Sequence, residues 1–152
     1  MVANKKAYVA APVVGITNEQ RQEIDRVVHV LEKCFDQIYC PWNLKIPNAW
    51  NMPMVQWARC VFTQDVLHLD QAHTVIVCDY GRHSSCGTAW EAGYAFAKGK
   101  KIIVVRMPNV KEVSLMVNNG CTIVVSYEDF INDNWITPDY VEENKTSPVI
   151  QN

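Results

Sequence analysis

Two acidic residues stand in patterns that could do chemistry. Glu91 lies in the segment GTAWEAGYA at residues 87–95, which follows an apolar run and a short loop and opens a helical pattern. We predict Glu91 in the first turn of that helix, where free backbone N–H groups and the helix dipole favour an ionised carboxylate. Such a carboxylate can attack an anomeric carbon. However, Thr88 three residues earlier also completes a capping box, a far commoner role, and the local pattern alone favours it.

The second acidic residue is Asp65, which lies three residues after Phe62 and four before Leu69. This spacing predicts its carboxylate on or beside the buried stripe of a helix. A carboxylate in that position needs a partner or a function. A helix-edge residue that reaches solvent or pairs with Arg59 fits the pattern equally well, so the sequence leaves both interpretations open.

Other motifs argue against a metal or a cofactor. The four histidines show no metal-ligand spacing, and the chain holds no P-loop and no G-x-G-x-x-G. We therefore expect neither a metal nor a cofactor. Arg82 and His83 precede Glu91 and could contact a phosphate, although a solvated pair of loop residues is the commoner outcome.

Length and composition fit one ordinary globular domain. The chain has 152 residues, of which 49% are hydrophobic and 20% charged, and a formal net charge of -2. Mixed charges without a basic cluster argue against a nucleic-acid partner, and no apolar run is long enough for a membrane span. Six cysteines form no C-x-x-C pair, which favours reduced and mostly buried thiols in a cytoplasmic protein.

Apolar runs alternate with helical patterns, which predicts an α/β fold with a doubly wound, parallel, five-stranded sheet. Strands are expected over residues 7–14, 37–40, 74–78, 101–106 and 122–125. A domain over residues 1–136 would be followed by a polar tail over 137–152. In such folds ligands bind beyond the carboxyl ends of the strands, so the loops after residues 14, 40, 79 and 106 are the first candidates for a site.

Helices are expected between these strands. A capping box at Thr17 and Gln20 starts the first, Pro53 suits the start of the second, and a third spans 88–97 with Gly99 after it. A short fourth helix is expected near 114–117. The stripe predicted to be buried in the second helix consists of Val55, Ala58, Phe62, Val66 and Leu69.

Several of these segments together resemble the nucleoside 2-deoxyribosyltransferase family. The similarity lies in residues 6–12 (KAYVAAP), in residues 57–97 with VFTQD and GTAWEAG, and in Ser-Leu-Met at 114–116, and it reaches to about residue 130. The family implies a flavodoxin-like fold, oligomers whose sites borrow residues from a neighbouring subunit, and a retaining double displacement.

The resemblance also implies roles for individual residues. Glu91 matches the nucleophile, Tyr8 the tyrosine that positions it, and Asp65 the carboxylate that handles the proton of the base. Met116 matches a residue that reaches into the neighbour's site. The candidate substrate-binding residues within the matching segments are Pro12, Ser85, Gly87, Ser114 and Met116. Tyr8 and the tryptophans at 42, 50 and 57 could sandwich a base.

Two positions depart from the transferase pattern. Ser85 stands where the family usually has Asp, and Ser114 stands where it has Asn before Leu-Met. Both serines resemble the related 2'-deoxynucleoside 5'-monophosphate N-glycosidases, because a hydroxyl can donate to a phosphate that a carboxylate would repel. The Gly- and Arg-rich loop of that group is absent from residues 12–17.

The sequence therefore leaves three functions open. The favoured one is a deoxyribosyltransferase that passes 2-deoxyribose between bases through a covalent Glu91 intermediate. The alternative is a hydrolase of deoxynucleoside monophosphates, and a third possibility is a nucleotide-binding module without catalysis. We expect a small nucleoside, nucleotide or free base as ligand and a homo-oligomer, at least a dimer.

Overall fold

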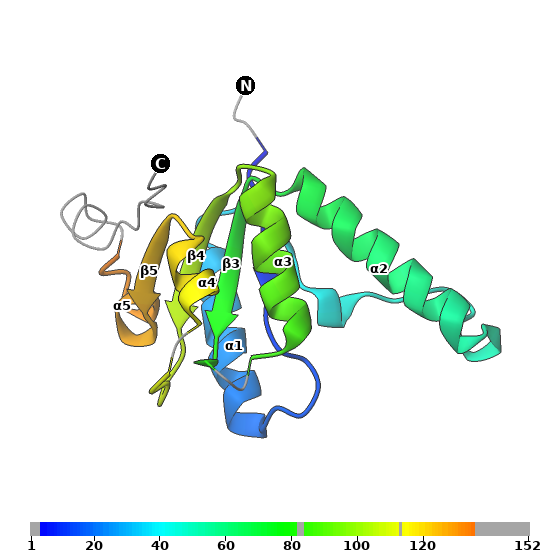
Figure 1. Ribbon diagram of the computed structural model, residues 1–152, viewed down its shortest axis with the longest axis horizontal. Coiled ribbons are helices and arrows are strands. Elements are labelled where there is room, and N and C mark those ends of the chain that lie inside the picture. Colours follow the sequence, from blue (N-terminus) through cyan, green and yellow to red (C-terminus); the bar gives the residue numbers. More distant parts are fainter. Residues whose placement is uncertain (1–3, 82–83, 113, 136–152) are drawn as a thin grey trace.

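Five parallel strands form one sheet in the order β2-β1-β3-β4-β5 (Figure 1). The computed structural model describes residues 4–81, 84–112 and 114–135. The strands are β1 (Lys6–Ala10), β2 (Gln37–Tyr39), β3 (Thr74–Asp79), β4 (Lys101–Arg106) and β5 (Ile123–Ser126). This is the flavodoxin-like strand order. The predicted doubly wound α/β fold is therefore confirmed.

Helices connect the strands and cover both faces of the sheet. They are α1 (Asn18–Leu31), α2 (Met54–Gln71), α3 (Cys86–Ala97), α4 (Leu115–Asn119) and α5 (Tyr127–Ile131). Two short 3-10 turns, η1 (Pro41–Asn43) and η2 (Ala49–Asn51), lie in the connection between β2 and α2. The tail expected over residues 137–152 lies outside the described residues.

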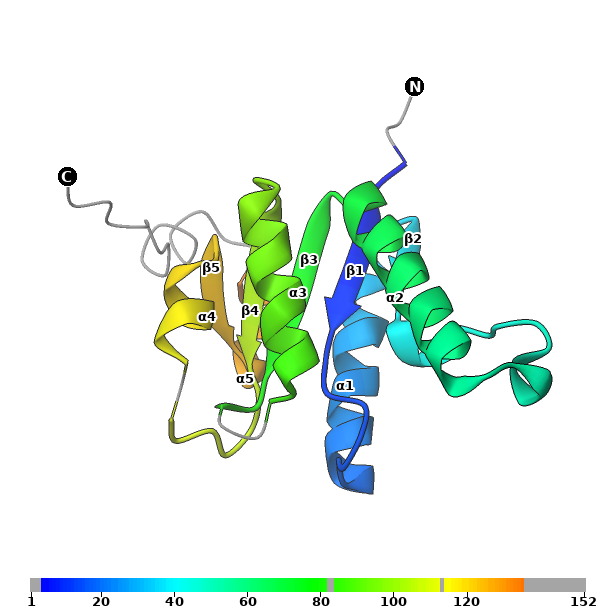
Figure 2. The same cartoon turned by 45° about the vertical axis from the view of Figure 1, so that its right-hand side comes forward.

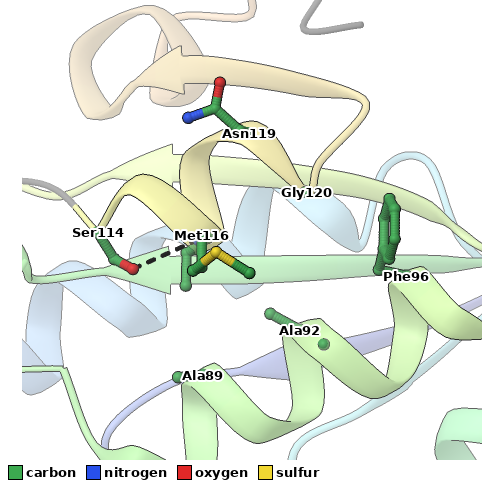
Figure 3. A pocket seen from close by; sticks show the side chains of 9 residues that line it. Ala89, Ala92, Phe96, Ser114, Met116, Asn119 and Gly120 are labelled. Carbon is green, nitrogen blue, oxygen red and sulfur yellow. Dashed lines mark hydrogen bonds between the residues drawn. The ribbon is translucent and has the colours of Figure 1, made fainter. Parts of the chain in front are cut away.

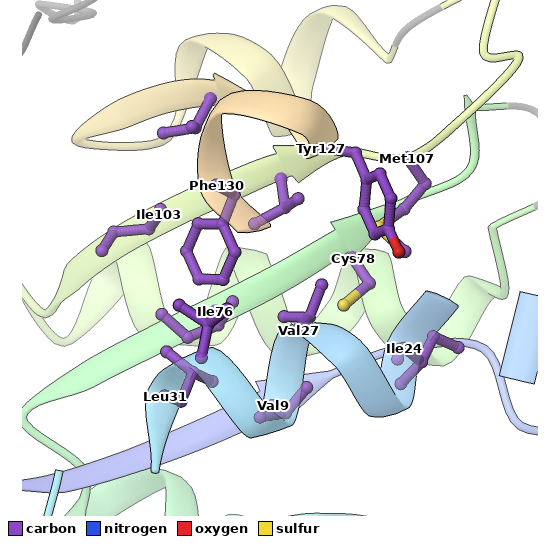
Figure 4. Packing of buried hydrophobic residues seen from close by; sticks show 14 of the residues in the cluster. Val9, Ile24, Val27, Leu31, Ile76, Cys78, Ile103, Met107, Tyr127 and Phe130 are labelled. Carbon is purple, nitrogen blue, oxygen red and sulfur yellow. The ribbon is translucent and has the colours of Figure 1, made fainter. Parts of the chain in front are cut away.

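One face of the sheet packs against α1 and α5. Alternate strand residues such as Val9, Ile76 and Ile103 point to this face, because successive side chains of a strand alternate between its two sides. They meet Val27 of α1 and Phe130 of α5, which are fully buried (Figure 4). This layer holds the larger of the two cores.

The opposite face packs against α2 and α3. Tyr8, Val75 and Val77 point to this side and meet Leu69 of α2 and Ala92 of α3. Figure 2 shows both helices in front of the sheet, α2 over β1 and α3 over β3 and β4. The two helices that carry the candidate carboxylates therefore share one face.

Local signals explain where several elements begin and end. The predicted capping box is present, because Thr17 Oγ1 accepts from the backbone N–H of Gln20 at 3.1 Å and Gln20 Oε1 accepts from that of Thr17 at 2.9 Å. Gly99 follows α3 with φ of 67°, the left-handed conformation expected of a residue just beyond a helix end.

The structure corrects three predicted boundaries. The first strand ends at Ala10 rather than residue 14, because Pro12 cannot donate to a ladder and Val14 is 91% exposed. Helix α3 begins at Cys86 rather than Thr88, because Ser85 caps it. The fifth strand is shifted to Ile123–Ser126, and α5, which no sequence pattern predicted, follows it directly.

The prediction that one apolar stripe of α2 is buried is wrong for the isolated chain. Leu69 is buried, but Val55 is 69% exposed, Phe62 is 57% exposed and Ala58 is exposed as well. The first turns of α2 project away from the sheet (Figure 1), and no other element among the described residues covers their apolar side chains.

The six cysteines are free thiols, but only Cys40, Cys78 and Cys121 are buried, whereas Cys34 and Cys86 are exposed. Among the described residues, no helix is both long enough and apolar enough to cross a bilayer.

Candidate active site

A pocket of about 390 Å³ lies between α2 and α3 and contains both candidate carboxylates. Helix α2 contributes Asp65 and α3 contributes Glu91, and Gly87 lies one turn before Glu91. The remaining lining residues are largely apolar: Phe62, Val66, Leu69, Cys86 and Trp90. The sheet brings the two acids together by holding both helices against one face.

Glu91 lies in the second turn of α3, so the prediction of a first-turn position is wrong. Ser85 rather than Thr88 is the N-cap, and its side chain accepts from the backbone N–H of Thr88 at 3.1 Å. The proposed capping role of Glu91 is thereby removed as well. Burial raises the pKa of Glu91 to about 7, and the nearby Asp65 charge adds to the rise while the Tyr8 hydroxyl opposes it. The Glu91 carboxyl is therefore expected to change between its protonated and ionised forms near neutral pH.

Tyr8 is the buried residue of β1 that faces Glu91. Its side chain is fully buried, and burial together with the negative charge of Glu91 holds the pKa of its hydroxyl far above the usual value. Tyr8 therefore remains a neutral donor. Its hydroxyl influences the Glu91 carboxyl, but the two do not meet ordinary hydrogen-bond geometry, and both Tyr8 Oη and Glu91 Oε2 are buried without a partner among the described residues.

Gly87 leaves the space beside the Glu91 carboxyl open. A Cβ atom at this position would stand 3.9 Å from Glu91 Oε1 and 3.7 Å from Ser85 Oγ. Larger side chains would reach into the pocket between α2 and α3. The sequence placed Gly87 among the substrate-binding residues, and its position beside the carboxylate suits that role.

Asp65 has a partner that the sequence did not indicate. The hydroxyl of Tyr39, the last residue of β2, donates to Asp65 Oδ1 at 2.7 Å. Burial raises the pKa of Asp65, and the Tyr39 hydrogen bond and His68 work in the opposite direction. An aromatic residue at the carboxyl end of a parallel strand was the signal that could have identified Tyr39.

Aromatic side chains line the pocket, but they differ from those expected. Phe62 of α2 and Trp90 of α3 pack edge to face, with ring centroids 5.4 Å apart. Trp50 is instead exposed on η2, and Trp42 packs against the core on the α1 and α5 face and lines a crevice together with Pro12. The predicted substrate-binding residue Pro12 therefore lines a different crevice from the pocket that contains the two carboxylates.

Ser114 and Met116 lie on a different side of α3 from Glu91. They line a pocket of about 470 Å³ between α3 and α4, together with Ala89, Ala92 and Phe96 (Figure 3). Ser114 caps α4 and accepts from the backbone N–H of Val117 at 3.4 Å. Met116 is 83% exposed. Neither residue reaches the Glu91 pocket of its own chain.

A buried hydrogen-bond network fixes the start of the loop before α3. Asp79, at the end of β3, accepts from the backbone N–H of Gly81 at 2.8 Å and from Asn118 Nδ2 at 3.1 Å. Gly81 has φ of 65°, and a Cβ there would collide with the backbone oxygen of Glu112. Arg82 and His83, which follow, lie outside the described residues.

Comparison with known proteins decides the family. The family model of nucleoside 2-deoxyribosyltransferases matches residues 7–133, most of the chain. The chain belongs to the nucleoside 2-deoxyribosyltransferase family. The resemblance noted in the sequence is confirmed, although a search of curated proteins finds no match.

Solved structures share the fold of this family member. The 2-deoxyribosyltransferase of the psychrotolerant bacterium Bacillus psychrosaccharolyticus matches with a TM-score of 0.69 and 22% identity, over 90% of this chain and 95% of that one. The CMP N-glycosidase BcmB of Clostridium botulinum matches with a TM-score of 0.59 and 18% identity, over 88% of this chain and 100% of that one. A conserved protein of Enterococcus faecalis V583 matches with a TM-score of 0.62 and 16% identity, over 93% of this chain and 99% of that one.

Membership of the 2-deoxyribosyltransferase family makes the pocket between α2 and α3 the candidate active site. It contains two of the three predicted catalytic residues, and the third, Tyr8, faces it from β1. Among the described residues, no group of three or more His, Cys, Asp or Glu side chains could hold a metal ion.

Proposed function

We propose that this protein cleaves the N-glycosidic bond of a 2'-deoxynucleoside and passes the deoxyribose to a second base. The observation that carries the proposal is the single pocket that Glu91 and Asp65 line from two different helices. Glycosyl transfer needs one carboxylate that attacks the sugar and one acid that protonates the leaving group. The distinct surroundings of the two acids suit those distinct roles.

The first step would form a covalent intermediate. A Glu91 carboxylate oxygen bonds to C1' while the bond from C1' to the base nitrogen breaks, and the base takes the electron pair. Asp65 transfers its proton to a ring nitrogen of the departing base, which makes the base a better leaving group. Tyr8 keeps its proton beside Glu91, and its neutral hydroxyl favours the ionised form of the Glu91 carboxyl.

The second step would reverse the first. A ring nitrogen of the incoming base attacks C1', the bond to Glu91 breaks, and the proton of the incoming base returns to Asp65. Two inversions at C1' retain the stereochemistry of the starting nucleoside. Water in place of the second base would give hydrolysis by the same residues.

The pocket favours an uncharged nucleoside over a 5'-monophosphate. No Lys or Arg is among its described lining residues, which instead include two acids. Ser85 Oγ is engaged with the backbone N–H of Thr88 at 3.1 Å and with Thr88 Oγ1 at 2.8 Å. Ser114 is likewise a helix cap. The two serines that suggested a nucleotide hydrolase therefore have structural roles of their own.

We also infer that the active form is a homo-oligomer. Large apolar side chains are exposed along α2, α3 and α4, including Phe62, Trp90, Phe96, Leu115 and Met116. Exposed apolar patches of this kind mark interaction surfaces. The segment 114–116 faces away from the pocket of its own chain, as expected if it completes the pocket of a neighbour.

The decisive experiment incubates the protein with 2'-deoxynucleosides and their 5'-monophosphates, with and without a second free base. Chromatography should show a new deoxynucleoside only when the second base is present. Release of free base from the monophosphate alone would instead support the N-glycosidase alternative. Absence of any cleavage would leave the non-catalytic nucleotide-binding module.

Asp65→Asn tests the acid role within this scheme. The variant should slow release of natural bases by roughly 10²–10⁴-fold. A substrate with a cationic leaving base, 7-methyl-2'-deoxyguanosine, needs no proton and should be spared. Equal slowing of both substrates would make Asp65 a structural residue.

A further inference from the structure

The side chain of Tyr39 is held between the elements that build the candidate site. Its ring stacks on His68 of α2, with centroids 3.8 Å apart and planes 11° from parallel. On its other side lies Tyr8, with centroids 5.3 Å apart. The hydroxyl donates to Asp65 Oδ1 at 2.7 Å. Three contacts from β1 and α2 therefore fix both the ring and the hydroxyl.

The direction of this hydrogen bond is also fixed. Burial and the hydrogen bond to Asp65 hold the pKa of Tyr39 well above its usual value, so the phenol keeps its proton. A phenol that keeps its proton donates to the carboxyl oxygen that it faces. Asp65 Oδ1 is thereby engaged as an acceptor. A proton added to Asp65 is then best carried by Oδ2, because a proton on Oδ1 would compete with the Tyr39 donor.

We propose that Tyr39 is a positioning residue that directs the acid proton of Asp65 onto Oδ2. The inference rests on the proposed function, in which Asp65 protonates the departing base. Tyr39 does not line the pocket itself. It acts through Asp65, by selecting which carboxyl oxygen carries the proton and by preventing rotation of the carboxyl group.

The surroundings of Asp65 determine how its proton responds to the loss of Tyr39. The titratable groups that face Asp65 are Tyr8 of β1, Tyr39 of β2, His68 of α2, and Glu91 and Cys86 of α3. Burial raises the pKa of Asp65, whereas the Tyr39 bond lowers it. Removal of the Tyr39 hydroxyl therefore raises the pKa of Asp65 further.

Tyr39→Phe isolates the hydroxyl, because the phenyl ring can keep the stacking on His68 and the contact with Tyr8. The chain offers a matched control in Tyr94→Phe. Tyr94 donates to Asp70 Oδ1 at the same distance of 2.7 Å, but this pair is exposed and lies outside the pocket lining. Both variants lose one Tyr–Asp hydrogen bond of equal length.

The kinetic test compares two substrates at pH 6. With a 2'-deoxynucleoside that carries a natural base, Tyr39→Phe should lower kcat by tenfold or more with little change in KM, since a well-placed acid contributes about 10²–10⁴-fold. With 7-methyl-2'-deoxyguanosine the change should stay within about twofold, because the leaving base is already cationic. Tyr94→Phe should change neither rate. Equal slowing of both substrates by Tyr39→Phe would overturn the proposal.

A second measurement does not depend on activity. The Asp65 carboxyl carbon, followed by ¹³C NMR through a pH titration, should show a higher pKa in Tyr39→Phe than in the wild type and no change in Tyr94→Phe. An unchanged Asp65 pKa in Tyr39→Phe would refute the positioning role. A wild type that cleaves neither substrate would refute the proposed function instead, and the titration would still decide whether Tyr39 controls the Asp65 proton.

Discussion

Glu91 of α3 and Asp65 of α2 line the same pocket, and the charge of Asp65 adds to the burial that raises the pKa of Glu91 to about 7. Two carboxyls that share a pocket resist simultaneous ionisation. One proton shared between a nucleophile and an acid is the state that glycosyl transfer requires. The two carboxyls therefore have different roles, and substitution of each is expected to have a different effect.

Glu91→Gln should abolish turnover while the fold remains intact. The amide keeps the shape of the side chain but cannot attack C1', so a loss of about 10⁴-fold or more is expected. Steady-state rates and a far-UV circular dichroism spectrum check the two halves of the prediction. Near-normal turnover in the folded variant would remove Glu91 from the role of nucleophile.

The rate should depend on the ionisation of Glu91. Since the attacking form is the carboxylate, kcat/KM for 7-methyl-2'-deoxyguanosine, whose leaving base needs no proton from Asp65, is expected to rise as pH increases through about 7. Asp65→Asn removes a charge that raises the pKa of Glu91. The rise of kcat/KM with pH should therefore occur at lower pH in this variant. A pH profile of kcat/KM on 7-methyl-2'-deoxyguanosine, measured in the wild type and in Asp65→Asn, tests both statements. If kcat/KM rises at the same pH in Asp65→Asn as in the wild type, the two carboxyls are not coupled.

Stability should show the opposite pH dependence. The folded-state pKa of Glu91 is about 7 and its ordinary value is 4.5, so the folded state holds the proton more tightly than the unfolded state. The resulting stabilisation is complete below about pH 4.5 and is lost as pH rises to about 7. Glu91→Gln cannot ionise, and at pH 8 it should exceed the wild type in unfolding free energy by on the order of 3 kcal/mol. Thermal unfolding at pH 4 and pH 8 measures the difference, which should be close to zero at pH 4.

Ser85→Asp tests the choice between nucleoside and nucleotide. Aspartate is also a good helix cap, so the fold should tolerate the change. Two unit charges about 4 Å apart repel by about 4 kcal/mol at an effective dielectric of ~20, so any activity on a monophosphate should collapse while activity on the nucleoside persists. Thr17→Asp, at the cap of α1 on the other face of the sheet, serves as the control. A wild-type preference for the monophosphate that disappears in Ser85→Asp would establish the nucleotide hydrolase.

The oligomer prediction concerns α4. Light scattering should give at least a dimer for the wild type. Met116→Glu places a charge on an apolar and 83% exposed side chain, and it should both dissociate the oligomer and reduce turnover. Gln22→Glu, on the exposed side of α1, should do neither. A fully active monomeric wild type would contradict the prediction.

Local pattern in the sequence determined most of the fold. Alternation of apolar runs with helical patterns predicted all five strands, and the span over residues 101–106 matches β4 residue for residue. Helix capping also depends on residues close together in the sequence, so Thr17 and Gln20 correctly predicted the start of α1. At the third helix the capping pattern of Thr88 and Glu91 predicted the wrong start, because Ser85 is the N-cap, and the sequence therefore placed Glu91 one turn too early.

The tertiary structure decided what the site contains. Tyr39 and Asp65 belong to different elements, and only the packing of α2 beside the end of β2 brings the hydroxyl within 2.7 Å of the carboxyl. Periodicity assigned Phe62 to the core, but the projecting start of α2 leaves its side chain exposed. Sequence periodicity reports which face of a helix is apolar, whereas the arrangement of the other elements determines whether that face is covered. The pKa of Glu91 likewise follows from burial and from the charge of a distant residue, neither of which local sequence encodes.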